Sequence, residues 1–127
     1  MSEVEAAKAI KAFFDAFNAH DGEAHLNTHH FPHIRINDKG QVAIVQNASE
    51  YLPLDSVLNY LTKHEGWHHS TLDSVEVIHA SPVKVHFNIQ FSRYQADGSR
   101  YAVHHSLWIV TRKDGRWGIQ ARSSYAP

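Results

Sequence analysis

The first apolar pattern along the chain has the period of an α-helix. From residue 3 to residue 19, apolar side chains recur every three or four positions, while lysine, aspartate and asparagine fall between them. After a break at residues 20–22, Asp21 is a suitable N-cap for a second, shorter helix that runs to about His29. The first segment predicts an amphipathic helix with a thick aromatic face, formed by Ala6, Ile10, Phe13, Phe14 and Phe17.

Two shorter segments follow with different periods. Apolar residues alternate with polar ones before the turn-forming sequence Asn-Asp-Lys-Gly at 37–40, and residues 42–45 resume an extended run, so we expect a short hairpin. Residues 49–65 carry leucine and valine at helical spacing, with a proline near the start and Gly66 just after the end. This pattern predicts a third helix.

The second half of the chain has the pattern of β-strands. The runs 71–79, 83–94, 99–112 and 117–125 are rich in β-branched and aromatic residues, and short turn sequences separate them. Such short links make consecutive strands antiparallel neighbours. The order of elements therefore predicts one α+β domain over residues 1–127, with helices packed on one face of a curved sheet.

Two segments resemble a known family. The opening FFDAFNAHD at 13–21 and the closing SLWIVTRKDGRWGIQARSS at 106–124 are similar to the nuclear-transport-factor-2-like superfamily, in its SnoaL-like branch. The resemblance implies a cone-shaped, cystatin-like fold with a mixed or antiparallel sheet, a pocket between the concave sheet face and the helices, and a homodimer through the convex face. The superfamily includes enzymes and domains without catalysis, so the fold leaves the activity open.

Composition narrows the classes of function. Lys plus Arg count 12 against 13 for Asp plus Glu, with the signs interspersed, which speaks against a nucleic-acid partner. Cysteine is absent, so disulfides, thiolate metal sites and thiol nucleophiles are excluded. The acidic N-terminus is unlike a signal peptide, and we expect a cytoplasmic protein with no membrane partner. The absence of P-loop, GxGxxG and GxSxG motifs gives little support to nucleotide-binding or serine-hydrolase functions, and we expect no cofactor.

Histidine is the outlier of the composition, with 12 residues. Each imidazole can change charge near neutral pH. His25 and His29 would stand one helical turn apart, and His33 could supply a third nitrogen to a metal ion. Since no HExxH motif accompanies them, we favour polar helix residues over a metal site and predict no metal.

Two registers are open for the strand at 99–112. Three-residue hairpin loops that end in glycine would place His105 on the concave face, with Trp108 and Arg122 on the convex face. Two-residue Asp-Gly turns would instead place Trp108 and His104 inside. We favour the first register, in which Trp108 is the centre of the predicted homodimer interface.

The favoured register brings chemically useful side chains toward one cavity. His33 and Arg35 share one face of the first short strand, while His69 and Asp73 share the phase of Val75 in a later strand. A histidine beside a carboxylate suits proton transfer. The candidate catalytic residues are His33, His69, His105 and Asp73, and the candidate ligand-binding residues are Phe13, Phe17, Arg35, Phe87 and Trp117.

The resemblance also excludes one reaction. In a ketosteroid isomerase, a tyrosine on the first helix and an aspartate on the first strand act on the substrate, and these positions fall at Phe13 and about Asn37 here. Neither side chain can perform those roles. We expect a domain that binds a small apolar or aromatic molecule, with possible acid-base catalysis of isomerase, dehydratase or cyclase type. The alternative is a non-catalytic ligand-binding or dimerisation module.

Overall fold

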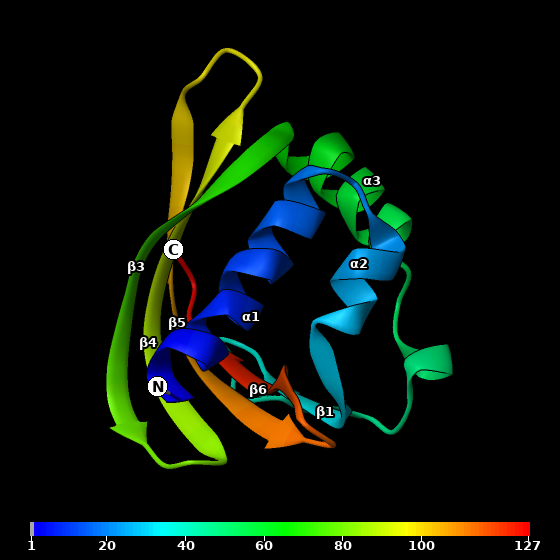
Figure 1. The fold of residues 1–127 in the computed structure, drawn as a ribbon. Coiled ribbons are helices and arrows are strands. Elements are labelled where there is room, and N and C mark those ends of the chain that lie inside the picture. The colour runs from blue at the N-terminus through cyan, green and yellow to red at the C-terminus, as the bar shows by residue number, and fades with distance from the viewer. Residues whose placement is uncertain (1) are drawn as a thin grey trace.

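The computed structural model describes residues 2–127. Its elements are α1 (Ser2–Asn18), α2 (Gly22–Asn27), β1 (His29–Ile36), β2 (Val42–Val45), the 3-10 helix η1 (Ala48–Glu50), α3 (Leu54–Glu65), β3 (Trp67–Ala80), β4 (Lys84–Gln95), β5 (Arg100–Lys113) and β6 (Arg116–Ser124). The strands form one sheet in the order β2-β1-β6-β5-β4-β3, which is antiparallel except for the parallel pair β1 and β6. Figure 1 shows the three α-helices on the concave side of this curved sheet. The predicted α+β architecture is confirmed.

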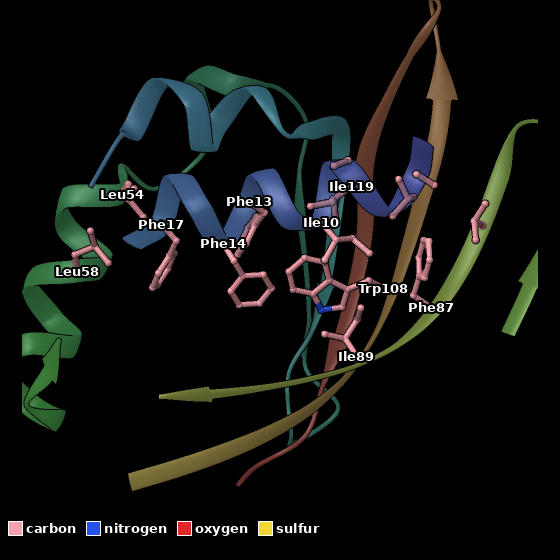
Figure 2. Packing of buried hydrophobic residues seen from close by; sticks show 14 of the residues in the cluster. Ile10, Phe13, Phe14, Phe17, Leu54, Leu58, Phe87, Ile89, Trp108 and Ile119 are labelled. Carbon is pink, nitrogen blue, oxygen red and sulfur yellow. The ribbon is translucent and has the colours of Figure 1, made fainter. Parts of the chain in front are cut away.

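Helix α1 supplies one wall of the core. Its aromatic face is directed at the sheet, where it meets Trp108 of β5 (Figure 2). The Phe14 ring stacks on the Trp108 ring with centroids 5.6 Å apart, and Phe13 meets the same indole edge-on at 4.9 Å. Burial of this apolar surface stabilises the fold, because each large side chain withdrawn from water contributes about 1.5–3 kcal/mol.

No helix within residues 2–127 is long and apolar enough to cross a membrane.

The hairpin between β5 and β6 is a two-residue turn, not the three-residue loop that we favoured. Asp114 and Gly115 both have positive φ, at 52° and 74°, and Lys113 pairs directly with Arg116. A type I′ turn requires positive φ at both central residues, and Asp-Gly is one of its preferred sequences. This turn brings Trp108 to the concave face.

The hairpin between β4 and β5 contains an irregularity that the sequence does not show. Its loop has three residues and ends in Gly98 at a φ of 88°, as expected. However, the ladder skips Tyr101, which is an extra residue on β5. This β-bulge moves the register by one residue, so that Phe91 pairs with His104 rather than with Val103.

Both hairpins therefore select the alternative register. Trp108 is 1% exposed within the core, and His104 faces the interior. His105 is exposed on the outer face of the sheet, opposite Gln90. The predictions of His105 inside and Trp108 outside are wrong, because one bulge and one short turn reverse the alternation of side chains along β5.

A second bulge changes the face of two predicted site residues. The ladder between β3 and β4 skips Asp73, so Val75 packs against the core while His69 lies on the outer side. His69 stacks on Tyr94 with ring centroids 4.7 Å apart, and Asp73 accepts a hydrogen bond from Thr71 at 2.8 Å. The prediction that His69 and Asp73 share the inward phase of Val75 is wrong.

A third bulge lies in β6. Here the ladder to β5 skips Gln120, since Ile109 pairs with Ala121 and the next residue of β5 pairs with Ile119. Ile119 is fully buried, and the extra residue turns Arg122 toward the same concave side. The placement of Arg122 on the convex face is therefore wrong.

The segment HHFPHIR lies wholly in β1. Helix α2 ends at Asn27, and Thr28 accepts a hydrogen bond from the backbone of Ile119, which starts the parallel pairing with β6. The expected helix to about His29 is too long by two residues. His25 and His29 thus belong to a helix and a strand, although their rings still meet, with centroids 4.9 Å apart.

Candidate functional site

A cavity of about 290 Å³ lies between α1 and the concave face of the sheet. One part of its wall is aromatic and comes mainly from α1, β4 and β5. Charged and polar groups from β1, the turn after it, β3, β4, β5 and β6 line the rest, together with the last residues of the chain. The aromatic residues are Phe13, Phe14, Phe17, Phe91, Trp108 and Tyr125, and the principal polar residues are Arg35, Asn37, Asp38, Arg93, His104, Arg122 and Ser124.

Arg122 is the central polar residue of the cavity. Its Nη2 donates a hydrogen bond to Tyr51 Oη at 2.9 Å, and its Nε donates to His33 Nε2 at 3.3 Å. The guanidinium carbon lies 5.1 Å from the ring centroid of Phe13 and 5.5 Å from that of Trp108. These aromatic faces stabilise a positive charge through their quadrupoles.

No carboxylate within residues 2–127 forms an ion pair with Arg122 or Arg35. Burial lowers the pKa of Arg122 to about 10, although Tyr51 stabilises its charged form. The positive charge of Arg35 also acts to lower that pKa. Arg122 is therefore protonated at neutral pH, and the site carries positive charge without a protein counter-ion.

Three buried histidines surround this charge. The Nδ1–H of His29 donates to the backbone oxygen of His25 at 2.9 Å, and the Nδ1–H of His33 donates to that of Ile119 at 3.0 Å. Carbonyl acceptors fix these tautomers, so each Nε2 carries a lone pair. The lone pair of His33 accepts the hydrogen bond from Arg122, whereas Nε2 of His25 and of His29 has no partner within residues 2–127.

The environment keeps these imidazoles neutral. Burial, and then the nearby charge of Arg122, lowers the pKa of His25 to about 4, of His29 to about 2 and of His33 to about 3. A metal ion would have to bind beside the same guanidinium. No group of three His, Cys, Asp or Glu side chains in the described part of the chain has metal-binding geometry. The charges thus favour an anion at this end of the cavity.

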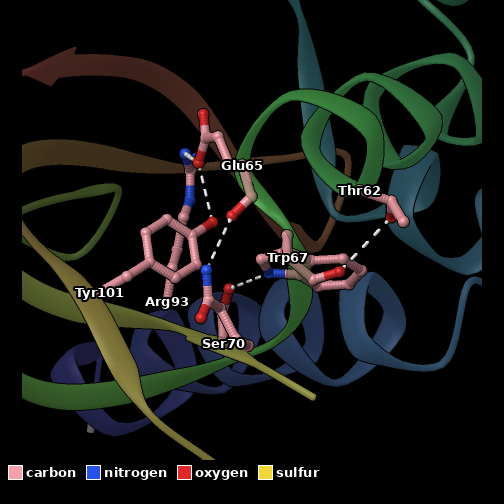
Figure 3. Close-up of polar contacts among 7 residues, drawn as sticks. Thr62, Glu65, Trp67, Ser70, Arg93 and Tyr101 are labelled. Atoms are coloured by element: carbon pink, nitrogen blue, oxygen red, sulfur yellow. Dashed lines mark hydrogen bonds and ion pairs between the residues drawn. The ribbon is translucent and has the colours of Figure 1, made fainter. Parts of the chain in front are cut away.

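Arg93 provides a contrast within the same cavity. Its Nη1 pairs with Glu65 Oε1 at 3.2 Å, and Tyr101 Oη donates to the same carboxylate oxygen at 2.7 Å (Figure 3). Burial, followed by the contact with Glu65, raises the pKa of Tyr101. The charge of Arg93 is therefore neutralised locally by the protein.

His104 lines the cavity beside this pair. Its ring stacks on Phe91 with centroids 5.0 Å apart and an angle of 13°. Burial lowers the pKa of His104, and its Nε2 has no hydrogen-bond partner within residues 2–127. A neutral imidazole of this kind can accept a proton or a hydrogen bond.

The cavity includes some of the predicted site residues and not others. Phe13, Phe17 and Arg35 line it as predicted. Phe87 is fully buried in the core, and Trp117 lies outside the cavity wall. His33 stands behind Arg122 and reaches the cavity only through it. The remaining catalytic candidates, His69, Asp73 and His105, do not line the cavity.

The sequence analysis assigned Arg122 to the convex face of the sheet and placed His104 inside only in the alternative register. The Asp-Gly pair before β6 was a signal for the shorter turn, and thus for Trp108 and His104 inside. Nothing in the local sequence marks Gln120 as the bulge that turns Arg122 inward.

Comparisons with known proteins agree with this fold. The family described as "NTF2-like protein (DUF6841)" matches residues 2–127. No curated protein matches the sequence. A protein of unknown function with a cystatin-like fold from Nostoc punctiforme is 12% identical, with a TM-score of 0.76 over 98% of this chain and 90% of that chain.

Two further solved structures show the same fold. An NTF2-like protein of unknown function from Pseudomonas putida is 14% identical, with a TM-score of 0.73 over 100% of this chain and 89% of that chain. A structure from Catenulispora acidiphila in complex with S-DNPA is 13% identical, with a TM-score of 0.69 over 98% of this chain and 92% of that chain. The family match over nearly the whole sequence shows that this chain belongs to the NTF2-like family DUF6841.

Proposed function

We propose that the protein binds a small, largely aromatic or apolar molecule in the cavity between α1 and the sheet. The observation that carries the proposal is the cavity itself, about 290 Å³ in volume and walled by six aromatic side chains beside polar and charged groups. Small-molecule sites are concave, mostly apolar and furnished with a few polar groups that orient the ligand. The solved structure from Catenulispora acidiphila, which has the same fold, is in complex with S-DNPA, and this supports small-molecule binding by the fold.

Binding has more support than catalysis. The four predicted catalytic residues do not converge on one point of the cavity, because His69, Asp73 and His105 lie elsewhere and His33 is covered by Arg122. Proton transfer to or from a bound molecule would fall to His104, the imidazole on the cavity wall. A non-catalytic ligand-binding module needs none of these roles and fits the arrangement directly.

A side chain that fills the cavity is expected to abolish binding. Ser124 lines the cavity, and Ser124→Leu would occupy part of its volume, so the affinity for small aromatic probes should fall at least tenfold. We would measure the binding of indole, 2-naphthol and phenylacetate by saturation-transfer NMR. Ser123→Leu is the matched control, since its neighbour on β5 is Leu107 and it does not line the cavity. Failure of every probe to bind the wild type, or equal binding by Ser124→Leu, would refute the proposal.

We also propose a homodimer through the outer face of the sheet, centred elsewhere than predicted. Trp108, the predicted centre, lies in the core. The outer face instead carries an apolar patch, which we call the outer patch, and within residues 2–127 the α-helices all lie on the opposite side (Figure 1). Ladder pairs such as Ile34 with Ile44 make the patch continuous across strands. The outer patch consists of Ile34, Ile36, Val42, Ile44, Leu107, Ile109 and Ala121.

A charge in the outer patch should dissociate this dimer. Ile109 pairs with Ala121 on one side and with His86 on the other, so Ile109→Glu would place two like charges near the centre of a two-fold interface. We expect sedimentation velocity at micromolar concentration to show a dimer for the wild type and a monomer for the variant. Leu52→Glu, at a position 59% exposed outside the patch, should remain dimeric. A monomeric wild type would contradict the prediction.

A further inference from the structure

We propose that Arg122 and Arg35 form an anion subsite at one end of the cavity, and that the ligand is an aromatic or apolar monocarboxylate. This inference rests on the proposed binding function and adds the chemical class of the ligand. Three observations support it. Tyr51 and His33 fix the guanidinium of Arg122, three of its N–H bonds have no partner within residues 2–127, and Arg93 is paired with Glu65 whereas Arg122 has no carboxylate partner there.

The guanidinium of Arg122 is fixed from behind. Tyr51 accepts from Nη2 and His33 accepts from Nε, while the rings of Phe13 and Trp108 lie within 5.5 Å of the guanidinium carbon. His33 is fixed in turn, because its Nδ1–H donates to the backbone oxygen of Ile119. Tyr51 and His33 are therefore positioning residues, which hold the guanidinium group of Arg122 in one orientation.

The other side of the Arg122 guanidinium has hydrogen-bond donors without partners. Two of the five N–H bonds of Arg122 have partners, so the remaining three, on Nη1 and Nη2, have none within residues 2–127. Arg122 lines the cavity, and its Nη1 is not among the fully buried atoms. In this it differs from Nε of Arg93, which is buried and has no partner. These N–H bonds therefore reach cavity space, where a carboxylate could accept two of them in parallel.

The positive charge at this end has no internal compensation. His25, His29 and His33 contribute polar atoms but no negative charge, and Arg35 adds a second cation to the cavity wall. Asp38 also lines the cavity and, like Arg35, is exposed, but it forms no ion pair with either arginine among the described residues. Arg93, on the same wall, already has its partner in Glu65. The cavity thus offers one uncompensated cationic end and an aromatic body.

The charge at this end favours a carboxylate over a phosphate group. A guanidinium binds either group through two parallel hydrogen bonds, but a phosphate dianion brings a second negative charge. Asp38 would oppose a second negative charge at the same wall. The aromatic side chains of α1 then accommodate an apolar body attached to the carboxylate.

The test compares charged ligands with neutral ligands of the same shape. We would titrate the full chain with phenylacetate, 3-phenylpropionate and 2-naphthoate, and with the three corresponding amides, by calorimetry at pH 7. The wild type should bind each carboxylate at least tenfold more tightly than its amide. Arg122→Met should reduce this preference to within twofold, and Arg35→Met should reduce it by about three- to fivefold. Arg112→Met is the matched control and should keep the preference, since that arginine is exposed and does not line the cavity.

The outcomes separate the inference from the function on which it rests. Equal affinity for acids and amides in the wild type would overturn the anion subsite and leave the proposed binding function intact. A wild type that binds none of the six compounds would overturn both. Tighter binding of benzylphosphonate than of phenylacetate would overturn the carboxylate assignment. If Arg122→Met does not fold, the acid-to-amide ratio of the wild type and of Arg35→Met still decides the question.

Discussion

Replacing Trp108 with alanine is expected to lower the free energy of unfolding by about 3–5 kcal/mol, the usual cost of deleting a large aromatic side chain from a core. Trp108 is 1% exposed and contacts the rings of Phe13 and Phe14. Its Nε1 donates to Ser106 Oγ at 2.8 Å, and its ring faces the guanidinium of Arg122. The truncation removes all of these contacts and leaves a cavity. Urea unfolding followed by far-UV circular dichroism would measure the loss.

The adjacent histidine is the matched control for this experiment. His105 is exposed on the outer face, so His105→Ala should change the free energy of unfolding by no more than about 0.5 kcal/mol. The pair therefore also tests the register of β5 in solution. A large loss for His105→Ala with a small loss for Trp108→Ala would show that the strand has the opposite phase.

The sequence predicted the elements because their signals are local. The apolar period of α1 reflects the face that it buries, and Asp114-Gly115 permits the tight turn that follows β5. The aromatic residues that α1 contributes to the cavity wall could be predicted for the same reason. Phe13 and Phe17 follow from helical geometry, which has no alternative register.

The polar half of the cavity could not be predicted in this way. Asp73, Tyr101 and Gln120 are each an extra residue in a strand, and each reverses which side chains face the core beyond it. Bulges are set by the curvature of the sheet and by the helices that pack on it, and the alternation pattern does not mark them. For this reason His69, His105 and Arg122 were assigned to the wrong face of the sheet.

The histidines around Arg122 have a consequence for stability. An unfolded histidine has a pKa of about 6.5, whereas burial and Arg122 lower the pKa values of His25, His29 and His33 to about 4, 2 and 3. Below pH 6.5, the unfolded chain therefore binds protons that the native protein does not bind. The free energy of unfolding must fall as the pH decreases through this interval, and it does not depend on these groups above it.

The expected slope is large, because the three histidines act together. Each contributes about 1.4 kcal/mol per pH unit, so the slope should approach about 4 kcal/mol per unit near pH 5. Integrated from neutral pH, the loss reaches about 5 kcal/mol near pH 5.3 and about 10 kcal/mol near pH 4, so a domain with a stability of about 5–10 kcal/mol would unfold between these two pH values. Urea unfolding at pH 7.5, 6.5, 5.5 and 5.0 would measure the slope.

His29→Gln should reduce the slope by about 1.4 kcal/mol per pH unit, the contribution of one proton, because glutamine does not titrate. His105→Gln, at an exposed position, should leave the slope unchanged. Equal free energies of unfolding at pH 7.5 and pH 5.0 would contradict the prediction. That result would mean that the three imidazoles take up protons in the native state as readily as in the unfolded chain, and that water screens the charge of Arg122.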